Sequence, residues 1–336
     1  MRIAVDAMGG DHAPDSNIEG AIEALSPEGI GPVARKQETE IVLVGKKELI
    51  KKKIAEKGYS ALPIEIYDAS QVIEMDESPV EACRKKPDSS IMVGISLAKN
   101  KEIDAFVSAG NSGAVMGSAV MSLERLKGVR RPAIAAIFPT LKEPCVVVDV
   151  GANAECKPKN LHQFALMGEA YVKYVFKKRI PRVALLSMGH EESKGDTATQ
   201  AAYKTLMKNN LNFIGNIEGG DIIKGVADVI VCNGFMGNVV LKFGEELASS
   251  ILGLLRVEID KSLVRKIGAK IMEGAFRDVK KKINYDEVGG APLLGVNGVC
   301  IICHGISNAK AIKNAINVAV EFVEQDVNRH IEESLL

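Results

Sequence analysis

The stretch Ala105-Phe-Val-Ser-Ala-Gly-Asn-Ser-Gly-Ala114 decides the fold class of this chain. Its first four residues form a short β-prone run, and small polar residues follow them as a loop. A helical pattern over 112–125 begins directly after this loop. A strand that leads through a glycine-containing loop into a helix is the repeating unit of α/β proteins.

The same unit recurs along the whole chain of 336 residues. Short apolar runs alternate with longer helical patterns, which predicts parallel strands with helices on both faces of the sheet. Several runs are apolar throughout, as expected for strands that are covered on both faces. We therefore expect one α/β catalytic unit over 1–336, with three α/β/α layers around a mostly parallel sheet. The predicted strands are 3–5, 41–44, 64–67, 105–108, 133–138, 146–150, 183–186, 213–217, 229–232 and 299–303, and the predicted helices are 15–25, 46–57, 78–86, 89–100, 112–125, 160–177, 197–208, 236–277 and 307–330.

Composition limits the possible functions. Lys plus Arg equal Asp plus Glu at 43 each, so there is no basic excess that would predict nucleic acid as a partner. The first residues, Met1-Arg-Ile-Ala-Val-Asp6, do not read as a signal peptide. No run approaches the length of about 18 apolar residues that indicates a membrane-spanning helix. We therefore expect a soluble protein of the cytoplasm.

Six cysteines are scattered along the chain, and reduced buried thiols are their expected state in a cytosolic protein. Cys300 and Cys303 have the spacing of a zinc or redox pair. They fall in the predicted strand 299–303, however, and residues three apart on a strand point to opposite faces. Because no second pair has zinc spacing, no metal site is expected.

Loops of small polar residues follow most of the predicted strands. In an open α/β sheet, ligands bind beyond the carboxyl ends of the strands. Six such loops therefore predict one composite cleft at a single edge of the sheet. They cover residues 6–14, 108–113, 149–155, 187–195, 218–221 and 233–238.

These loops suit the binding of a phosphate or an oxyanion. Glycine lets backbone N–H groups approach a ligand closely, and a helix N-terminus adds unpaired donors. No dinucleotide fingerprint or Walker loop is present, so no nucleotide cofactor is expected. The chain also lacks a Gly-x-Ser-x-Gly elbow, so a covalent serine nucleophile has no support.

The ordered set of loop motifs closely resembles the bacterial phosphate acyltransferases of phospholipid synthesis, the PlsX family. The resemblance is carried by Asp-Ala-Met-Gly-Gly-Asp at 6–11, Ser-Ala-Gly-Asn-Ser-Gly-Ala at 108–114, Asp-Val-Gly-Ala-Asn at 149–153 and Asn-Gly-Phe-Met-Gly-Asn at 233–238. Each motif alone is weak, but the set in this order is specific. The resemblance runs from the first strand to the final helix after His304-Gly-Ile-Ser-Asn308.

The resemblance implies a reaction in which acyl-[acyl carrier protein] and inorganic phosphate give acyl phosphate and free carrier protein. It implies an isocitrate/isopropylmalate dehydrogenase-like fold, a group that also contains phosphotransacetylases. A homodimer is expected, with no metal or nucleotide cofactor. The product would pass to a membrane glycerol-phosphate acyltransferase, a partner that is expected to be indirect.

Candidate site residues come from the polar loops. We expect Lys194 to bind phosphate, Asn233 to donate to the thioester oxyanion, and His12 and His304 to assist proton movement. Ser108, Asn111 and Ser112 begin a helix that could cradle phosphate. The other expected substrate-binding residues are Asp6, Gly9, Gly10, Asp149, Asn153, Gly234 and Asn238.

Three other functions fit parts of the same pattern. A phosphotransacetylase that acts on a short acyl-coenzyme A would use similar loops, and a hydroxy-acid dehydrogenase would add a nicotinamide site and acidic metal ligands. A non-catalytic scaffold that binds acyl carrier protein at a membrane is the third. The six ligand-like loops favour an enzyme, and the apolar segment after Leu247 favours a long acyl chain.

The segment 247–282 predicts a protruding amphipathic helical region. Its apolar residues recur at three- and four-residue steps, and 256–282 contains nine basic and four acidic residues. Such a helix can bind anionic headgroups reversibly at the inner face of the plasma membrane. A face that packs on the core, on a second copy or on acyl carrier protein remains an alternative.

Overall fold

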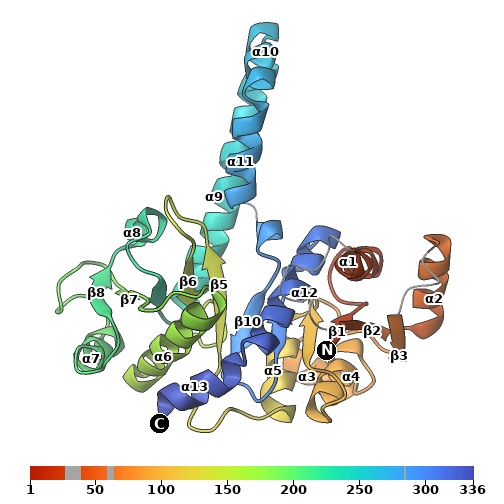
Figure 1. Ribbon diagram of the computed structural model, residues 1–336, viewed down its shortest axis with the longest axis horizontal. Helices are drawn as coiled ribbons and strands as arrows, with labels where there is room; N and C mark the ends of the chain where they lie inside the picture. Colours follow the sequence, from red (N-terminus) through yellow and green to blue (C-terminus); the bar gives the residue numbers. More distant parts are fainter. Residues whose placement is uncertain (27–38, 59–63, 284) are drawn as a thin grey trace.

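A computed structural model describes residues 1–26, 39–58, 64–283 and 285–336. One sheet of eleven strands runs through the molecule in the order β3-β2-β1-β4-β11-β10-β5-β6-β9-β7-β8 (Figure 1). The strands are β1 (Arg2–Asp6), β2 (Glu40–Gly45), β3 (Ile64–Asp68), β4 (Ala105–Ser108), β5 (Ala133–Phe138), β6 (Cys145–Val148), β7 (Val183–Leu186), β8 (Phe213–Ile217), β9 (Val229–Val231), β10 (Ala291–Leu294) and β11 (Cys300–Ile302).

The sheet consists of two parallel halves that run in opposite directions. Strands β1 to β4 and β11 pair in parallel, and β6 to β9 form a second parallel set. Between them, β10 pairs antiparallel with β11 and with β5, and β5 pairs antiparallel with β6. Three successive reversals leave the second half antiparallel to the first.

Helices cover both faces of the sheet. They are α1 (Asp15–Leu25), α2 (Lys47–Glu56), α3 (Pro79–Lys85), α4 (Ser90–Lys99), α5 (Ser112–Ser122), α6 (Pro158–Val175), α7 (Thr197–Leu206), α8 (Gly219–Lys224), α9 (Gly234–Asp260), α10 (Leu263–Ile271), α11 (Glu273–Ile283), α12 (Ala309–Glu324) and α13 (Val327–Leu335), with a 3₁₀ turn at Tyr285–Glu287. Residues of α1, α6, α12 and α13 join the core on one face, and residues of α4, α5 and α8 join it on the other.

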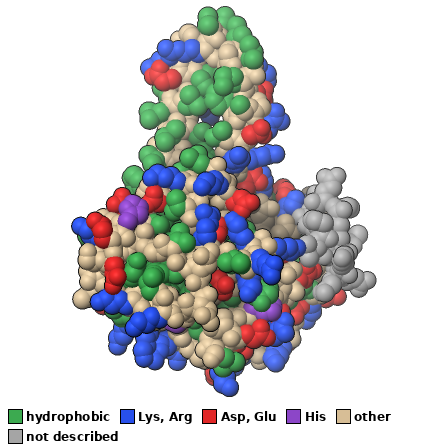
Figure 2. Space-filling model, turned by 60° about the vertical axis from the view of Figure 1, so that its left-hand side comes forward, with side chains coloured by type: hydrophobic (Ala, Val, Ile, Leu, Met, Phe, Trp, Pro, Cys, Tyr) green, Lys and Arg blue, Asp and Glu red, His purple; other side chains and the backbone are tan. Residues whose placement is uncertain are grey.

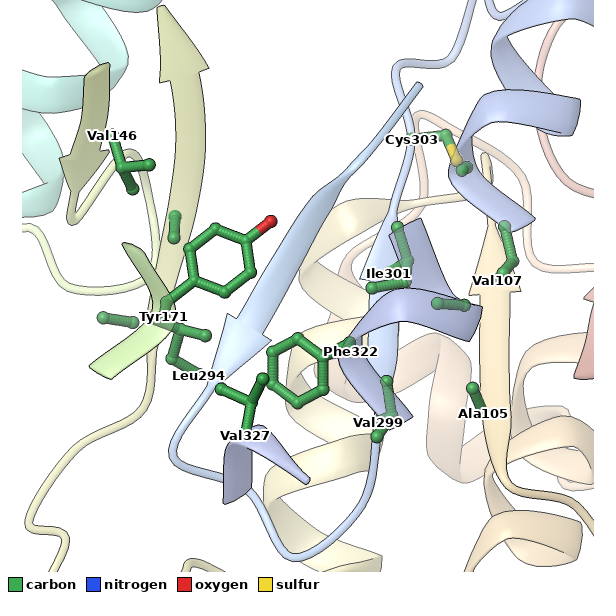
Figure 3. Packing of buried hydrophobic residues seen from close by; sticks show 14 of the residues in the cluster. Ala105, Val107, Val146, Tyr171, Leu294, Val299, Ile301, Cys303, Phe322 and Val327 are labelled. Carbon is green, nitrogen blue, oxygen red and sulfur yellow. The ribbon is translucent and has the colours of Figure 1, made fainter. Parts of the chain in front are cut away.

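One apolar core unites the two halves of the sheet. On the α6 and α12 face, the rings of Tyr171 and Phe322 lie with their centroids 6.0 Å apart. Figure 3 shows Leu294 of β10 and Val327 of α13 beside this pair, with β4 and β11 on one side and β6 on the other. Side chains from both halves of the sheet therefore contribute to this core cluster.

The fold class predicted from sequence is confirmed, with local differences. The alternation of faces along β11 is also confirmed, since Cys300 and Cys303 belong to the core clusters on opposite sides of the sheet. Strand β10 and helix α8 were not predicted. The expected helix 236–277 is divided into α9, α10 and α11, and the expected helix 307–330 into α12 and α13.

The distal part of α9 rises from the body together with α10 and α11 (Figure 1). We call this part the arm, residues 247–283. No residue of α10 or α11 is buried, and Val264 and Ile271 are each 80% exposed. None of the described helices has both the length and the apolar content to cross a bilayer.

Candidate active site

The six polar loops do not share one edge of the sheet, so the expected single composite cleft is wrong. The loops after β1 and β4 lie at one edge, where the loop after β11 joins them. The loops after β6, β7, β8 and β9 lie at the opposite edge, because the antiparallel centre reverses the second half. We call the two groups the Asp6 cluster (residues 6–14, 108–113 and 303–308) and the Asp149 cluster (149–157, 187–196 and 233–238).

Asp149 organises the second cluster through its buried carboxylate. The Oδ1 atom accepts hydrogen bonds from the backbone N–H groups of Ile134, Gly151 and Ala152. The Oδ2 atom accepts from the backbone N–H of Asn153 at 2.7 Å and from its side-chain Nδ2 at 2.9 Å. Burial raises the pKa of Asp149, whereas these hydrogen bonds act to lower it. A carboxylate with this many donors holds the loop in one conformation rather than serving as a free base.

Asn233 begins α9 at the edge of this loop. Its Oδ1 accepts a hydrogen bond from the Met236 N–H at 2.8 Å, the geometry of an N-cap. Among the described residues, no hydrogen bond uses its Nδ2 amide. The Gly234 N–H donates to the Asn153 carbonyl at 2.7 Å, which joins the two loops. The N-terminus of a 27-residue helix therefore lies beside the Asp149 loop.

The loop after β7 also reaches the Asp149 cluster. Asp196, the N-cap of α7, lies close enough to Cys156 to contribute to the electrostatic environment of this thiol. Lys194 precedes it on the same loop, and its side chain is exposed. Asn238 in the first two turns of α9 is exposed as well. The cluster thus contains a helix N-terminus beside the Asp149 loop, the exposed amide of Asn238, and the exposed Lys194 on the loop after β7.

Arg131 adds a cation that the sequence motifs did not reveal. Its Nη1 lies 3.4 Å from Oδ1 of Asn153. Asn153 is held from its other side, because its Nδ2 donates to the Pro132 carbonyl at 2.7 Å. The basic pair Arg130-Arg131 before β5 was the available signal, but it belongs to no motif.

The thiols of Cys156 in the Asp149 cluster and of Cys232 beside it are poor nucleophiles. Cys232 is buried, and Cys156 is half-buried rather than fully buried as expected. Burial, with the negative charge of Asp149, raises the pKa of Cys156 to about 11 and raises that of Cys232 as well. A thiol with such a pKa is almost entirely protonated near neutral pH.

Asp6 organises the first cluster. Its Oδ2 accepts from the Ser108 hydroxyl at 2.7 Å, and its Oδ1 accepts from the Met8 N–H. Asn17 donates through Nδ2 to the carbonyls of Asp6 and Gly9. Burial raises the pKa of Asp6, against the lowering effect of these hydrogen bonds.

Glycines allow the loops of the Asp6 cluster to pack backbone against backbone. A Cβ on Gly9 would stand 2.5 Å from the Gly110 nitrogen. Gly10 has a φ of +95° and lies against the Gly305 carbonyl. Close packing of the backbone is therefore enough to account for glycine at these positions, and ligand binding is not needed to explain it.

The start of α5 is built differently from the expected phosphate cradle. Asn111 caps the helix by accepting from the Ala114 N–H, and its Nδ2 donates to the carbonyls of Glu74, Met75 and Glu77. This side chain is therefore committed to the fold, and it cannot also bind phosphate through the same groups. Ser112 is exposed at the helix start.

His304 follows β11 and meets α9. Its Nε2 contacts the Lys242 Nζ, and Lys242 also pairs with Glu245 at 2.9 Å. Burial and the Lys242 charge lower the pKa of His304. His12 is exposed on the loop after β1. Lys242 and Glu245 lie within a helix, so the pattern of polar loops in the sequence does not include them.

Helix α9 connects the two clusters. Asn233 caps it in the Asp149 cluster, and Lys242 contacts His304 in the Asp6 cluster. Nine residues separate them, about 13 Å along a helix that rises about 1.5 Å per residue. The expected composite cleft would place His12 and His304 beside Asn233 and Lys194. In the structure, His12 and His304 belong to the Asp6 cluster, whereas Asn233 and Lys194 belong to the Asp149 cluster.

Among the described residues, no group of three or more His, Cys, Asp and Glu side chains could hold a metal ion. His190, which follows β7, contacts Asp221 of α8 through Nε2 at 2.8 Å. The Asp149 cluster contains amide and backbone N–H donors and the cations Lys157 and Lys194, and it also contains the carboxylates Asp149, Glu155, Glu191, Glu192 and Asp196. Its amide and N–H donors suit an anion.

Comparison with solved structures agrees with the fold. The chain is similar to a phosphotransacetylase from Streptococcus pyogenes, with a TM-score of 0.60 and 16% identity over 96% of this chain and 94% of that one. It is also similar to a 4-hydroxythreonine-4-phosphate dehydrogenase from Klebsiella pneumoniae, with a TM-score of 0.55 and 11% identity over 96% and 97% of the two chains. At these identities the likeness concerns the fold alone.

Comparison of sequences identifies the family. A family model described as "Fatty acid synthesis protein" matches residues 1–330. The chain is 49% identical to a phosphate acyltransferase of Dictyoglomus turgidum over 338 residues, which cover 100% of this chain and 98% of its relative. A phosphate acyltransferase of Geotalea daltonii is also 49% identical, with 100% and 94% covered. The resemblance drawn from the loop motifs is thereby confirmed: the chain belongs to the fatty acid synthesis protein family, and it is an acyltransferase of the phosphate acyltransferase group.

Proposed function

We propose that the chain transfers a fatty acyl group from acyl carrier protein to inorganic phosphate at the Asp149 cluster. The observation that carries this assignment is the position of Asn233. Its Oδ1 is fixed as the cap of α9, and its Nδ2 can donate beside the rigid Asp149 loop. Arg131 and the exposed Lys194 add positive charge on neighbouring loops. Together these groups suit two adjacent anions, the phosphate and the oxyanion of a tetrahedral intermediate.

The reaction needs little acid–base catalysis. An oxygen of phosphate attacks the thioester carbonyl, the carbon–oxygen bond forms, and the electrons of the carbon–sulfur bond leave with the thiolate. Because a thiol has a pKa of about 8.5, this leaving group departs without a strong acid. The protein mainly has to hold phosphate in line and stabilise the oxyanion.

Each side chain of the cluster has a proposed role. Asn233 donates to the oxyanion, and Lys194 binds phosphate together with Arg131. Asp149 and Asn153 fix the loop, and Gly234 and Asn238 border the acyl thioester. His304, with Lys242, can take part only if the substrate extends about 2.5 helical turns along α9.

The proposed partners are acyl carrier protein and a second copy of the chain. The proposed location is the cytoplasm, with reversible contact between the arm and the inner face of the plasma membrane. Leu263, Val264 and Ile267 of α10 are exposed, and Arg265 and Lys266 lie among them. Exposed apolar and basic residues on one helix are typical of interfacial binding to anionic lipid. A membrane glycerol-phosphate acyltransferase would then receive the product.

Hydroxylamine trapping tests this function directly. Wild-type protein, acyl-[acyl carrier protein] and phosphate are incubated with a chelator and hydroxylamine, and acyl hydroxamate is the expected product. The reaction should depend on phosphate and continue without added metal or nucleotide. Acetyl-coenzyme A in place of the carrier protein tests the phosphotransacetylase alternative. Folded protein that yields no phosphate-dependent hydroxamate from acyl-[acyl carrier protein] would overturn the proposal, whether or not acetyl-coenzyme A is used.

A further inference from the structure

The arm and the body present different surfaces to a partner. Figure 2 shows hydrophobic side chains gathered on the arm, whereas side chains of both charges are mixed over the face of the body below it. An acyl carrier protein is a small acidic protein, and charged partners are recognised through complementary charge. A surface that receives it is therefore expected on the body, where cations lie near the Asp149 cluster.

The loop between α5 and β5 carries such cations. Residues 124–131, which we call the basic loop, contain four basic residues and one acidic residue. All four cations are exposed, and within the described part of the chain none of them lies in ion-pairing distance of a carboxylate. Because the whole chain has equal numbers of basic and acidic residues, this group is a local excess of positive charge. Its members are Arg125, Lys127, Arg130 and Arg131.

Carboxylates at the basic loop reduce this excess but do not cancel it. Glu124 is the acidic member of the loop, so four cations less one carboxylate leave a formal charge of +3. Glu332 of α13 accepts a hydrogen bond from the Lys127 backbone N–H at 3.0 Å, so it also touches the loop. Counting Glu332 as well still leaves two positive charges in excess. The loop therefore suits a partner with a negative surface.

Direct contacts hold the basic loop in one conformation. The Nη1 atom of Arg125 donates to the Arg130 carbonyl at 2.6 Å, which closes the loop on itself. Gln163 of α6 accepts from the Arg130 N–H at 2.9 Å and donates through Nε2 to the Gly128 carbonyl at 2.8 Å. The cations thus extend from a fixed backbone, which lowers the entropy lost when a partner binds.

The basic loop is continuous with the Asp149 cluster. The Nη1 atom of Arg131 lies 3.4 Å from Oδ1 of Asn153, and the Asn153 carbonyl accepts from the Gly234 N–H at 2.7 Å. Gly234 follows the cap Asn233, so two contacts lead from the loop to the proposed oxyanion donor.

The basic loop lies away from the arm. A Cβ on Gly128 would stand 3.8 Å from the Leu335 Cβ, so the loop borders the last helix. The C-terminus that follows Leu335 lies at the end of the body opposite the arm (Figure 1). A protein docked on the basic loop therefore leaves the arm uncovered.

The prosthetic arm of the carrier protein limits how far its docking surface can lie from the site. The sulfur and the phosphorus of phosphopantetheine are about 13 bonds apart, and an extended backbone spans at most about 3.5 Å for three bonds, so this arm reaches about 15 Å. The basic loop meets this limit at both ends. Arg131 contacts the Asp149 cluster directly, and the guanidinium of Arg125 is held at the carbonyl of Arg130, the residue before it.

We propose that the basic loop is the docking surface for the acidic acyl carrier protein. The carrier would contact Arg125, Lys127 and Arg130 while its prosthetic arm passes Arg131 into the Asp149 cluster. This inference rests on the proposed function, which makes the carrier protein a substrate. Exposed charge pairs act on association rather than on the chemical step. Loss of the cations should therefore raise the KM for the carrier protein and leave kcat nearly unchanged.

Lys127→Glu with Arg130→Glu tests the surface. Within the described structure neither side chain donates a hydrogen bond, so the loop keeps its internal contacts. We expect the KM for acyl-[acyl carrier protein] to rise at least about fivefold and kcat to change less than about twofold. With the same acyl group on pantetheine, which lacks the carrier, the KM should stay at the wild-type value. An equal rise for both donors would mean that the loop supports the site, and it would overturn the proposal.

Lys204→Glu with Lys208→Glu is the matched control. Both residues are exposed cations at the end of α7 remote from its N-cap Asp196. This pair changes the net charge by the same amount and should keep the wild-type KM. Added salt should raise the KM for the carrier protein in wild type more than in the loop variant, because salt screens exposed charges. Equal KM values for the two charge-reversed pairs would indicate general repulsion and would overturn a defined surface.

A binding titration keeps this inference separate from the proposed function. Holo-carrier protein without an acyl group is labelled and titrated with the full chain, and its fluorescence anisotropy is measured. The loop variant should bind it at least about fivefold more weakly than wild type. Lys127→Gln with Arg130→Gln should change the affinity in the same direction by less, and it serves if charge reversal impairs folding.

The outcomes distinguish the possible partners of the basic loop. If wild type forms acyl hydroxamate but the loop variants bind the carrier protein like wild type, only this inference fails. If wild type forms no hydroxamate from acyl-[acyl carrier protein], the proposed function fails, and the titration still reports on the surface. A loop variant that loses self-association in sedimentation velocity, or binding to anionic vesicles, with unchanged affinity for the carrier protein would assign the loop to a second copy or to a membrane and would overturn the proposal.

Discussion

Gly237 of α9 packs directly on the backbone of Asp149: a Cβ at Gly237 would stand 1.9 Å from the Asp149 carbonyl oxygen. The backbone fixes both the Cβ position at Gly237 and the Asp149 carbonyl oxygen. No side-chain rotation can therefore relieve such a contact. The first turns of α9 can approach the loop only with glycine at this position. The same contact sets the distance between the cap Asn233 and the Asp149 loop.

Gly237→Ala should therefore disturb the site more than its small size suggests. We expect a loss of about 1–3 kcal/mol in the free energy of unfolding, because the loop or the helix must shift. Turnover should fall with it, since misplacement by about 1 Å can cost about 100-fold in rate. Denaturant unfolding and hydroxamate formation measure the two effects. Gly244→Ala is the control, because its Cβ would meet Phe138 only at 4.0 Å; equal behaviour of the two variants would contradict the packing argument.

Asn233 allows capping to be separated from catalysis. Asn233→Asp keeps an oxygen for the Met236 N–H but removes the Nδ2 donor. We expect its stability to stay near wild type and its turnover to fall on the order of 100-fold, as for loss of an oxyanion donor. Asn233→Ala should lose turnover and also about 1 kcal/mol of stability, because the cap is lost. Near-normal turnover of Asn233→Asp would exclude the proposed donor.

The sequence predicted most of the fold because the strands and helices follow local patterns. Strand β10 was missed because Pro292 interrupts an already short run, and proline in a strand argues against that assignment. The missed strand affects the predicted site as well as the four residues of β10 themselves. Without β10 the sheet appears uniformly parallel, and all six loops appear to share one edge.

The candidate site was predicted less completely because its parts depend on tertiary packing. The sequence identified Asp149 and Asn233 as loop residues, yet it could not show that Asp149 is saturated by backbone donors or that Asn233 is a cap. Lys242 faces His304 only because α9 passes from one edge of the sheet to the other. No local pattern contains such a contact.

Cysteine chemistry should not contribute to turnover. The raised pKa of Cys156, about 11, leaves almost no thiolate near neutral pH. Cys156→Ala should therefore retain most activity, and intact-protein mass spectrometry of the working enzyme should show no added acyl group. Cys232→Ala serves as a second variant, although its burial makes some loss of stability expected. An acylated enzyme that forms and decays at the turnover rate would refute direct attack by phosphate.

The pH dependence of His304 should reveal its contact with Lys242. Burial and this neighbouring charge lower the pKa of His304 in the folded protein. The unfolded chain then binds more protons as the pH falls through the ordinary range of histidine, so this group reduces stability in acid and has no such effect above that range. Lys242→Met should raise the His304 pKa, as measured from its imidazole resonances. Lys204→Met, an exposed change on α7, should leave it unaltered; an identical His304 pKa in all three proteins would contradict the contact.

Contact with membranes should depend on α10 rather than on the body of the protein. Leu263, Val264 and Ile271 are 74%, 80% and 80% exposed at the end of the arm, and basic residues lie between them. Val264→Glu with Ile267→Glu places carboxylates on the face that would enter the lipid. We expect binding to anionic vesicles to fall at least about tenfold, because each buried apolar contact is replaced by a charge that anionic headgroups repel.

Leu141→Glu, at an 82% exposed position of the body, is the matched control and should bind vesicles like wild type. Hydroxamate formation in solution and the sedimentation coefficient should stay unchanged in both variants. Loss of the dimer in the α10 variant would instead assign this face to a second copy of the chain, and undiminished vesicle binding would refute membrane contact through α10.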